Sequence, residues 1–185
     1  MSGKRKKEDP KVHRLVNESI LGFPSGKAAQ SIRSIIHRDL SSHDVECITV
    51  VLVSHLMIEK RISDLIYNWL TKNLPQMSGK SKSGTSVNDL AKDTLNKNIE
   101  KLDFSKKVEL IKPLGILLWS DDSKDIFADI YKINNARVDI VHRMDISTIK
   151  FKSKSLNTED GLEHFFDLAQ QRLLNISELM ELIDG

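Results

Sequence analysis

Apolar side chains recur at alternating steps of four and three between residues 41 and 75, the spacing of one helix face. The recurring positions are Ile48, Leu52, His55, Glu59, Ile62, Ile66 and Trp69. Ser41 followed by Asp44 has the spacing of a helix start, and Pro75 follows the last position. Further apolar residues widen this stripe beyond what a surface helix needs. We therefore predict one long helix with contacts on two sides, as in a bundle core or a dimer seam.

The same periodicity predicts several more helices. We expect them at about 27–38, from Ser86 to Leu102, from Asp103 or Ser105 through Ile111, from Asp121 to His142 or Met144, and from Thr158 onward. Pro113 is expected to kink the third of these helices or to restart it before Leu114 to Trp119. The segment 147–152 alternates weakly and predicts a short extended piece or hairpin. The fold class expected from these patterns is all-α, an up-and-down bundle of five or six helices.

Composition changes this picture only at the edges of the domain. The chain has 185 residues, a length that fits one domain. We expect a basic, flexible arm over 1–24, a single helical domain over 25–185, and a flexible loop near 75–86, where Ser, Gly and Lys accumulate. The net charge of +2 is too small to indicate nucleic-acid binding by the whole surface. The absence of an apolar leader or spanning stretch, and the single cysteine, predict a cytoplasmic protein.

Metal and thiol chemistry are poorly supported by the residues. The six histidines are scattered, without the pairs at helical spacing that hold metals in helical bundles, so we expect no metal and no cofactor. Cys47 falls within the apolar pattern, which is typical of an inert buried thiol. His55 and Glu59 lie one turn apart and both are expected to face inward. They form either a buried hydrogen-bonded pair or part of a catalytic site.

A polar cluster interrupts the helix predicted to end near Met144. It comprises Asn134, Asn135, Arg137, Asp139, His142 and Arg143. Asn135, Asp139 and His142 fall on one face, whereas Arg137 and His142 differ by about 140 degrees. One straight helix therefore cannot direct Arg137 and His142 at one atom, but a symmetric dimer can supply them from two helices across a shared cleft.

These residues resemble the motif of the HEPN superfamily. The resemblance lies in Arg137-x-x-x-x-His142, preceded by Asn134 and by the segment Leu102-Asp-Phe-Ser-Lys-Lys-Val-Glu-Leu-Ile-Lys-Pro-Leu-Gly115, after a long helix with Glu59. It covers about Ser41 to Leu182 and is nearest to the mannitol-repressor-like and toxin-like branches.

The resemblance implies a homodimeric, metal-independent endoribonuclease. Arg137 would stabilise the charge that develops on the phosphorus, and His142 would act as general acid or base on RNA. Asn134, Asn135, Asp139 and Glu59 would support them, and Arg143, Lys80 and Lys82 would contact RNA. Such a protein would act as a toxin or defence effector, held in check by an antitoxin or another regulatory protein.

A non-catalytic interpretation stays open beside the ribonuclease. Val138 occupies the position after the motif arginine, where the family usually has a polar residue. Relatives without activity keep the fold as binding or regulatory modules, because function lies in the site and not in the fold. In that case Arg137 would pair with a carboxylate, and the chain would be a helical interaction or transcriptional regulatory protein.

Overall fold

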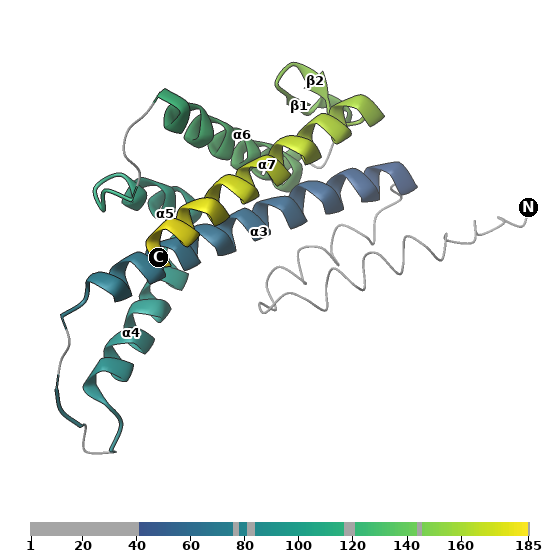
Figure 1. Ribbon diagram of the computed structural model, residues 1–185. Helices are drawn as coiled ribbons and strands as arrows, with labels where there is room; N and C mark the ends of the chain where they lie inside the picture. The colour runs from purple at the N-terminus through teal and green to yellow at the C-terminus, as the bar shows by residue number, and fades with distance from the viewer. Residues whose placement is uncertain (1–40, 76–77, 81–83, 117–120, 144–145, 185) are drawn as a thin grey trace, which may run out of the picture. The chain divides into compact units, whose positions relative to one another are not determined.

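The computed structural model describes residues 41–75, 78–80, 84–116, 121–143 and 146–184, and most of these are helical (Figure 1). The elements are α3 (Ser42–Asn73), α4 (Val87–Lys101), α5 (Phe104–Ile111), α6 (Asp121–Arg143), the 3-10 helix η1 (Ile146–Thr148), β1 (Lys150–Phe151), β2 (Lys154–Ser155) and α7 (Glu159–Asp184). The predicted all-α class is confirmed. None of the described helices is long and apolar enough to cross a membrane.

Two predicted segments lie outside the described residues: the basic arm over 1–24 and the helix at 27–38. The described chain divides into two compact units, each assembled from segments that are distant in sequence. Unit 1 comprises Met1–Val53 and Ala136–Phe166, and unit 2 comprises Ser54–Asn135 and Asp167–Gly185. The helices α3, α6 and α7 contribute residues to both units.

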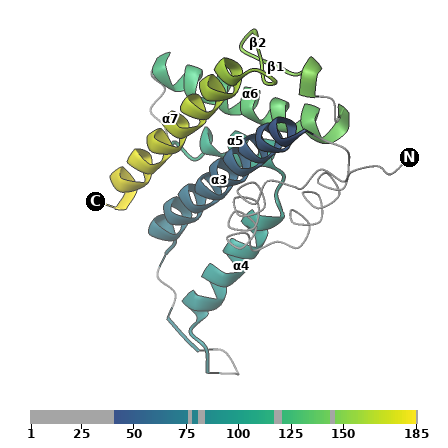
Figure 2. The ribbon, with the colours of Figure 1, turned by 90° about the vertical axis from the view of Figure 1, so that its right-hand side faces the viewer.

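Unit 1 is organised around the beginning of α3, the end of α6 and a β-hairpin that leads into α7 (Figure 2). The predicted start of α3 is confirmed, because the Asp44 backbone N–H donates to Ser41 Oγ at 3.1 Å and Asp44 Oδ2 accepts from the Ser41 N–H at 3.1 Å. The expected short extended piece is the hairpin β1–β2, which extends three residues past the predicted end. The most deeply buried side chains of unit 1 are Cys47, Val51, Ile140, Ile149, Phe151, Leu156 and Phe165.

Unit 2 holds the larger apolar core, supplied by the remaining parts of α3, α6 and α7 together with α4 and α5. Its most deeply buried side chains are Ile58, Ile62, Leu65, Ile66, Ile111, Ile130 and Ile133. Helix α5 begins where predicted, because Asp103 Oδ1 accepts from the Lys106 N–H at 2.9 Å. This hydrogen bond lowers the pKa of the Asp103 carboxyl. The helix ends at Ile111, two residues before Pro113.

Some of the expected faces differ from the structure. Phe166 fits the apolar period of α7 and Leu90 that of α4, so both are expected to face inward, but each is 42% exposed. Ser86 precedes α4 as predicted, but its side chain makes no capping hydrogen bond. The apolar stripe of α3 is buried from Ile48 to Ile66 in a single copy of the chain, with Ile48 and Leu52 at 5% and 6% exposure, whereas Trp69 is half-buried. A dimer seam at those residues is therefore not needed to explain the width of the stripe.

Candidate functional site

Arg137 and His142 both lie on the last part of α6, in unit 1. Arg137 is partly buried and makes no hydrogen bond or ion pair with any residue that the structure describes. The pairing of Arg137 with a carboxylate, expected for a non-catalytic chain, is therefore absent from the described part. His142 is exposed. Because α6 stays helical through Arg143, the two side chains leave it in directions about 140 degrees apart.

The other predicted site residues are distributed over both units. Asp139 belongs to unit 1, is partly buried and has an interaction partner. Asn135 belongs to unit 2 and is exposed. Lys80 is exposed in the segment between α3 and α4, where it forms an isolated bridge with Ser86. Lys82 and the side chain of Arg143 lie outside the described part.

A buried polar cluster joins three helices of unit 2, and it contains two of the predicted supporting residues. His55 of α3, 3% exposed, donates from Nε2 to Asn134 Oδ1 of α6 at 3.0 Å. Glu59 of α3 accepts from Lys107 Nζ of α5 at 2.7 Å. The His55 ring also lies against Phe104, with ring centroids 4.6 Å apart.

His55 and Glu59 face inward, as predicted, and both belong to this cluster. The hydrogen bond that one interpretation expected between them is absent. His55 Nδ1 and Glu59 Oε2 are 4.0 Å apart, beyond hydrogen-bonding distance. Each residue is bonded instead to a different neighbouring helix, and all buried side-chain polar atoms in the described residues have partners. The cluster therefore has the character of a satisfied core network that fixes the packing of α3, α5 and α6 within unit 2.

Lys107 is the member of this cluster that the sequence patterns did not identify. Lys107 is 4% exposed. Lysine is almost never fully buried unless it is paired, and here the partner is Glu59. The available signal was its position, because Phe104, Val108 and Ile111 are all buried on α5 and Lys107 lies on the same face.

A second buried ion pair in unit 2 was also missed. Arg172 of α7 donates from Nη2 to Asp129 Oδ2 of α6 at 2.7 Å, and from Nε to the same oxygen at 3.2 Å. Asp129 is 3% exposed and also lies 3.6 Å from Lys132 Nζ. Arg172 further donates to Asn175 at 3.0 Å. Because Arg172 and Asp129 are bonded to each other, we interpret the pair as a structural contact that joins α6 to α7 within unit 2.

Cys47 is fully buried in unit 1, as its place in the apolar pattern predicted. Its thiol donates to the Leu156 carbonyl at 3.1 Å and lies 3.6 Å from His43 Nε2. Burial, followed by the nearby Glu46 and Asp44 carboxylates, raises the pKa of the thiol to about 11. The thiolate that a nucleophilic cysteine needs is therefore scarce near neutral pH.

Among the described residues, no group of three or more His, Cys, Asp or Glu side chains is arranged to hold a metal ion. Comparison of the whole chain with protein-family models, curated proteins and solved structures finds no match.

Proposed function

We propose that the chain is a HEPN-like, metal-independent endoribonuclease that acts as a toxin or defence effector. The observation that supports it most is the partly buried Arg137, whose cation has no anionic partner in the described part of the chain. An arginine that a fold does not use for its own ion pair is available to a phosphate, which it can bind through two parallel hydrogen bonds. The accessible His142 follows five residues later.

The proposed reaction uses the 2′-hydroxyl of RNA as the nucleophile. The 2′-oxygen forms a bond to phosphorus while the bond from phosphorus to the 5′-oxygen breaks. His142 takes the proton of the 2′-hydroxyl or gives one to the leaving 5′-oxygen, because histidine exchanges protons near neutral pH, and solvent water supplies or accepts the other proton. Arg137 stabilises the negative charge that builds up on the phosphoryl oxygens. Since one straight α6 cannot direct both groups at one phosphate, the two side chains come from two copies of the chain.

The test is cleavage of single-stranded or transfer RNA by the full chain in EDTA. We expect cleavage without added metal, and a loss of about 100-fold or more in His142→Ala, because a positioned acid or base contributes about 10² to 10⁴ in rate. Arg137→Ala should lose activity similarly. His164→Ala and Arg61→Ala are the matched controls and should retain activity, and circular dichroism should show that all four variants are folded.

Cleavage that survives unchanged in His142→Ala would show that a different residue or a contaminant is responsible. If the wild-type chain leaves RNA intact at every protein concentration tested, the ribonuclease proposal is wrong.

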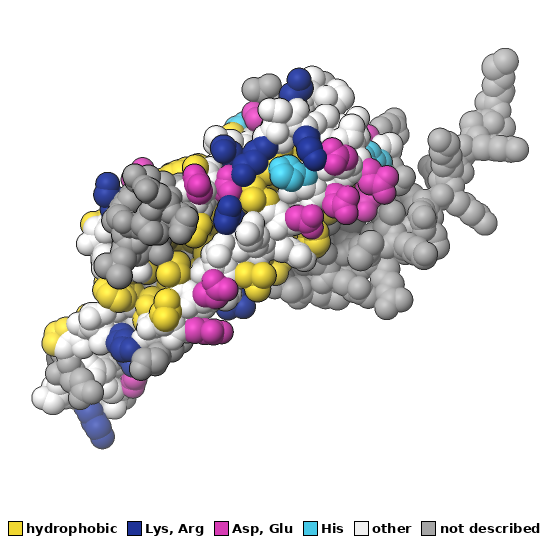
Figure 3. Space-filling view, turned by 45° about the horizontal axis from the view of Figure 1, so that its top comes forward, with side chains coloured by type: hydrophobic (Ala, Val, Ile, Leu, Met, Phe, Trp, Pro, Cys, Tyr) yellow, Lys and Arg dark blue, Asp and Glu magenta, His cyan; other side chains and the backbone are white. Residues whose placement is uncertain are grey.

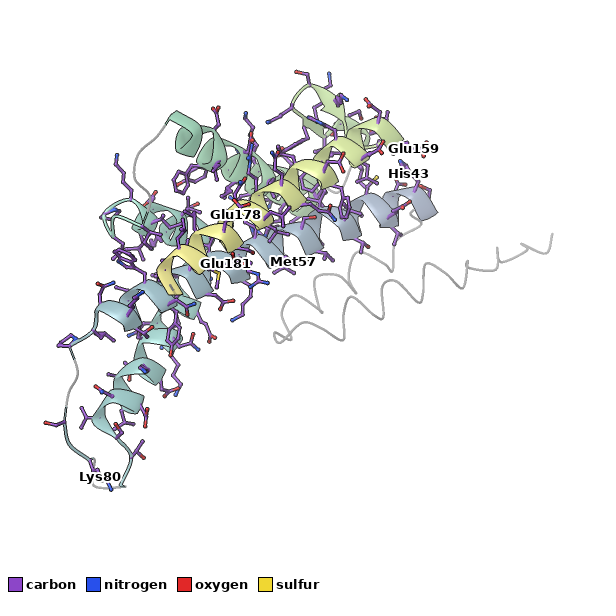
Figure 4. All side chains as sticks on the ribbon, in the orientation of Figure 1. His43, Met57, Lys80, Glu159, Glu178 and Glu181 are labelled. Atoms are coloured by element: carbon purple, nitrogen blue, oxygen red, sulfur yellow. The ribbon has the colours of Figure 1, made fainter. Side chains whose placement is uncertain are left out.

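A second candidate is a non-catalytic helical interaction or transcriptional regulatory protein. It is favoured by large apolar side chains exposed in unit 2: Met57 on α3 is 50% exposed, and Leu174 and Leu182 on α7 are 64% and 79% exposed. Met57 is labelled on α3 in Figure 4, and the labels Glu178 and Glu181 mark the part of α7 that also carries Leu174 and Leu182. Exposed apolar side chains of this size are typical of protein-binding surfaces when they gather in one patch. Intact RNA in the EDTA assay, together with a stoichiometric protein partner, would favour this candidate.

A further inference from the structure

In unit 2 the outward faces of α3 and α7 carry opposite charges. Between residues 54 and 73 of α3, every exposed charged side chain is basic: Lys60, Arg61 and Lys72. Between residues 167 and 183 of α7, every exposed charged side chain is acidic: Asp167, Glu178 and Glu181. Both stretches lie entirely within the described residues. Unit 2 therefore presents a basic helix face and an acidic helix face.

The two faces belong to neighbouring helices. The Lys72 ammonium, in the last turn of α3, donates to the Ile183 carbonyl near the end of α7. Figure 1 and Figure 2 both show α7 beside α3. In Figure 4 the labels of Met57 on α3 and of Glu178 and Glu181 on α7 lie close together. The basic and acidic faces therefore lie next to each other within unit 2.

Five residues on these faces define what we call the α3–α7 patch: Met57 and Arg61 on α3, and Leu174, Glu178 and Glu181 on α7. The two α3 residues are four positions apart and the three α7 residues follow at steps of four and three, so each group shares one side of its helix. Met57 is 50% exposed and Leu174 is 64% exposed. Figure 3 shows hydrophobic side chains near the centre of the view, with acidic and basic side chains directly beside them. The patch therefore combines apolar area with charges of both signs.

The charges of the patch have no partner among the residues that the structure describes. Arg61, Glu178 and Glu181 are exposed and form no hydrogen bond or ion pair there. Lys60, the neighbour of Arg61, differs because it is bonded to Asp64 at 2.8 Å. Exposed apolar side chains that lie beside unpaired charges of both signs are the features expected of a protein-binding surface.

The arrangement of these charges fits a second copy of the same chain. The cation lies on one helix and the carboxylates lie on its neighbour, so a two-fold rotation about an axis perpendicular to the patch lays α3 of each copy over α7 of the other. Arg61 of each copy then faces Glu178 and Glu181 of the other copy, and Met57 and Leu174 are enclosed between the two. A surface that carries both members of its own ion pairs is self-complementary, as a two-fold interface requires.

We propose that the α3–α7 patch is an interface between two copies of this chain. The pairing of Arg61 with Glu178 and Glu181 occurs twice in the dimer, and Met57 and Leu174 supply its apolar centre. The proposal does not depend on cleavage of RNA. It goes beyond the proposed function by naming the surface that holds the second copy.

Charge reversal tests the proposed pairing in the full chain. Light scattering of the wild type should give twice 21.0 kDa at micromolar concentration. Arg61→Glu and the double variant Glu178→Lys/Glu181→Lys should each be monomeric there, because like charges then face each other twice and raise the dissociation constant at least about 100-fold. Lys101→Glu, an equal charge reversal at an exposed position of α4, is the matched control and should remain dimeric.

Mixing the two reversed variants is the decisive measurement. In a mixed dimer the reversed α3 of one variant faces the reversed α7 of the other, and the two unaltered faces meet as in the wild type. The equimolar mixture should therefore return to the mass of a dimer, although each variant alone is monomeric. An ion pair within one chain cannot be restored by mixing, so only pairing between copies gives this result.

Alanine substitutions test the apolar centre separately from the charges. Leu174→Ala should raise the dissociation constant about tenfold or more, because it removes an apolar contact twice in each dimer. Leu90→Ala, at an exposed leucine of α4, is the matched control and should leave the dissociation constant unchanged. Arg61→Ala removes a charge without adding a repulsion, and an exposed ion pair contributes no more than about fivefold, so this variant should remain dimeric at micromolar concentration. Circular dichroism should show that all variants are folded.

The outcomes separate this inference from the proposed function. Monomeric reversed variants whose mixture is dimeric support the patch, whether or not the wild type cleaves RNA. Reversed variants that stay dimeric would overturn the patch and leave the ribonuclease proposal standing, because the second copy then binds elsewhere. A mixture that stays monomeric would also overturn the proposed pairing. So would a wild type that is monomeric at every concentration tested, including one that binds a different protein through this surface.

Discussion

At the scale of single residues, the helix spacing of α3 predicted that His55 and Glu59 face inward, and both take part in the buried cluster of unit 2. The spacing could not predict their partners, because Lys107 and Asn134 come from other helices and are brought there by packing. The same limit applies to Arg137. The sequence showed that Arg137 belongs to a motif. It could not show that Arg137 has no partner among the described residues, because that depends on which carboxylates the fold places nearby.

Removing the Lys107 charge should reduce the stability of the protein, because Glu59 is paired with it. In Lys107→Met the Glu59 carboxylate, whose side chain is 25% exposed, loses its closest cation. We expect a loss of about 1–3 kcal/mol in the free energy of unfolding, below the 3–5 kcal/mol of a fully buried pair because water still reaches Glu59. Chemical denaturation measures this. The double variant Lys107→Met/Glu59→Leu should recover most of the loss, since neither charge then stays unpaired.

Lys106 provides a matched control for this experiment. It is exposed and lies 3.5 Å from Asp103, so Lys106→Met should change stability by no more than about 0.5 kcal/mol. A double variant that is less stable than Lys107→Met would contradict the charge-pairing explanation and indicate a packing role for the Glu59 side chain.

At the scale of secondary-structure elements, the helix bounds followed from local signals. Ser41 with Asp44, Asp103 before α5, and Thr158 before α7 all make capping hydrogen bonds, and such bonds involve residues within one turn of each other. The buried faces were harder to predict, because an apolar residue such as Phe166 fits a helical period whether or not another element covers it.

Gly161 offers a test of how the hairpin is attached to α7. In an exposed helix position, replacing glycine by alanine should stabilise a protein by about 1 kcal/mol. Here an added Cβ would lie 1.9 Å from the Ser155 carbonyl oxygen, which is backbone and cannot rotate away. We therefore expect Gly161→Ala to reduce the free energy of unfolding by about 1–3 kcal/mol.

Thermal denaturation of Gly161→Ala beside Gln170→Ala, an exposed position of the same helix, measures this effect. Gln170→Ala should have a Tm near that of the wild type. A Tm for Gly161→Ala at or above the wild-type value would mean that the hairpin does not rest on the first turn of α7.

At the scale of the whole molecule, the main consequence concerns the number of copies needed for one site. Helix α6 continues without interruption to Arg143, so a second copy is required if Arg137 and His142 are to meet at one phosphate. Most of the apolar residues of α3 that suggested a dimer seam, from Ile48 to Ile66, are already buried, which weakens one argument for a dimer. The requirement for two copies therefore rests on the geometry of the site.

Light scattering and subunit mixing test this requirement together. We expect a mass of twice 21.0 kDa at micromolar concentration. Mixing Arg137→Ala with His142→Ala subunits should restore cleavage, because a mixed dimer regains one composite site with both groups intact. Each variant alone should stay inactive. A monomer that cleaves RNA, or mixtures as inactive as the separate variants, would contradict a site shared between two copies.

The sequence by itself determined the helical class, the bounds of the described helices, the caps of α3, α5 and α7, the inward direction of His55 and Glu59, and the burial of Cys47. These features depend on residues within one or two helical turns of each other, so they can be predicted from the local spacing of residues in the sequence. Tertiary structure alone decided that Lys107 is buried on Glu59, that Arg172 pairs with Asp129, and that the hairpin rests on Gly161. Each of these contacts joins residues from different elements, and only the packed chain brings their side chains within bonding distance.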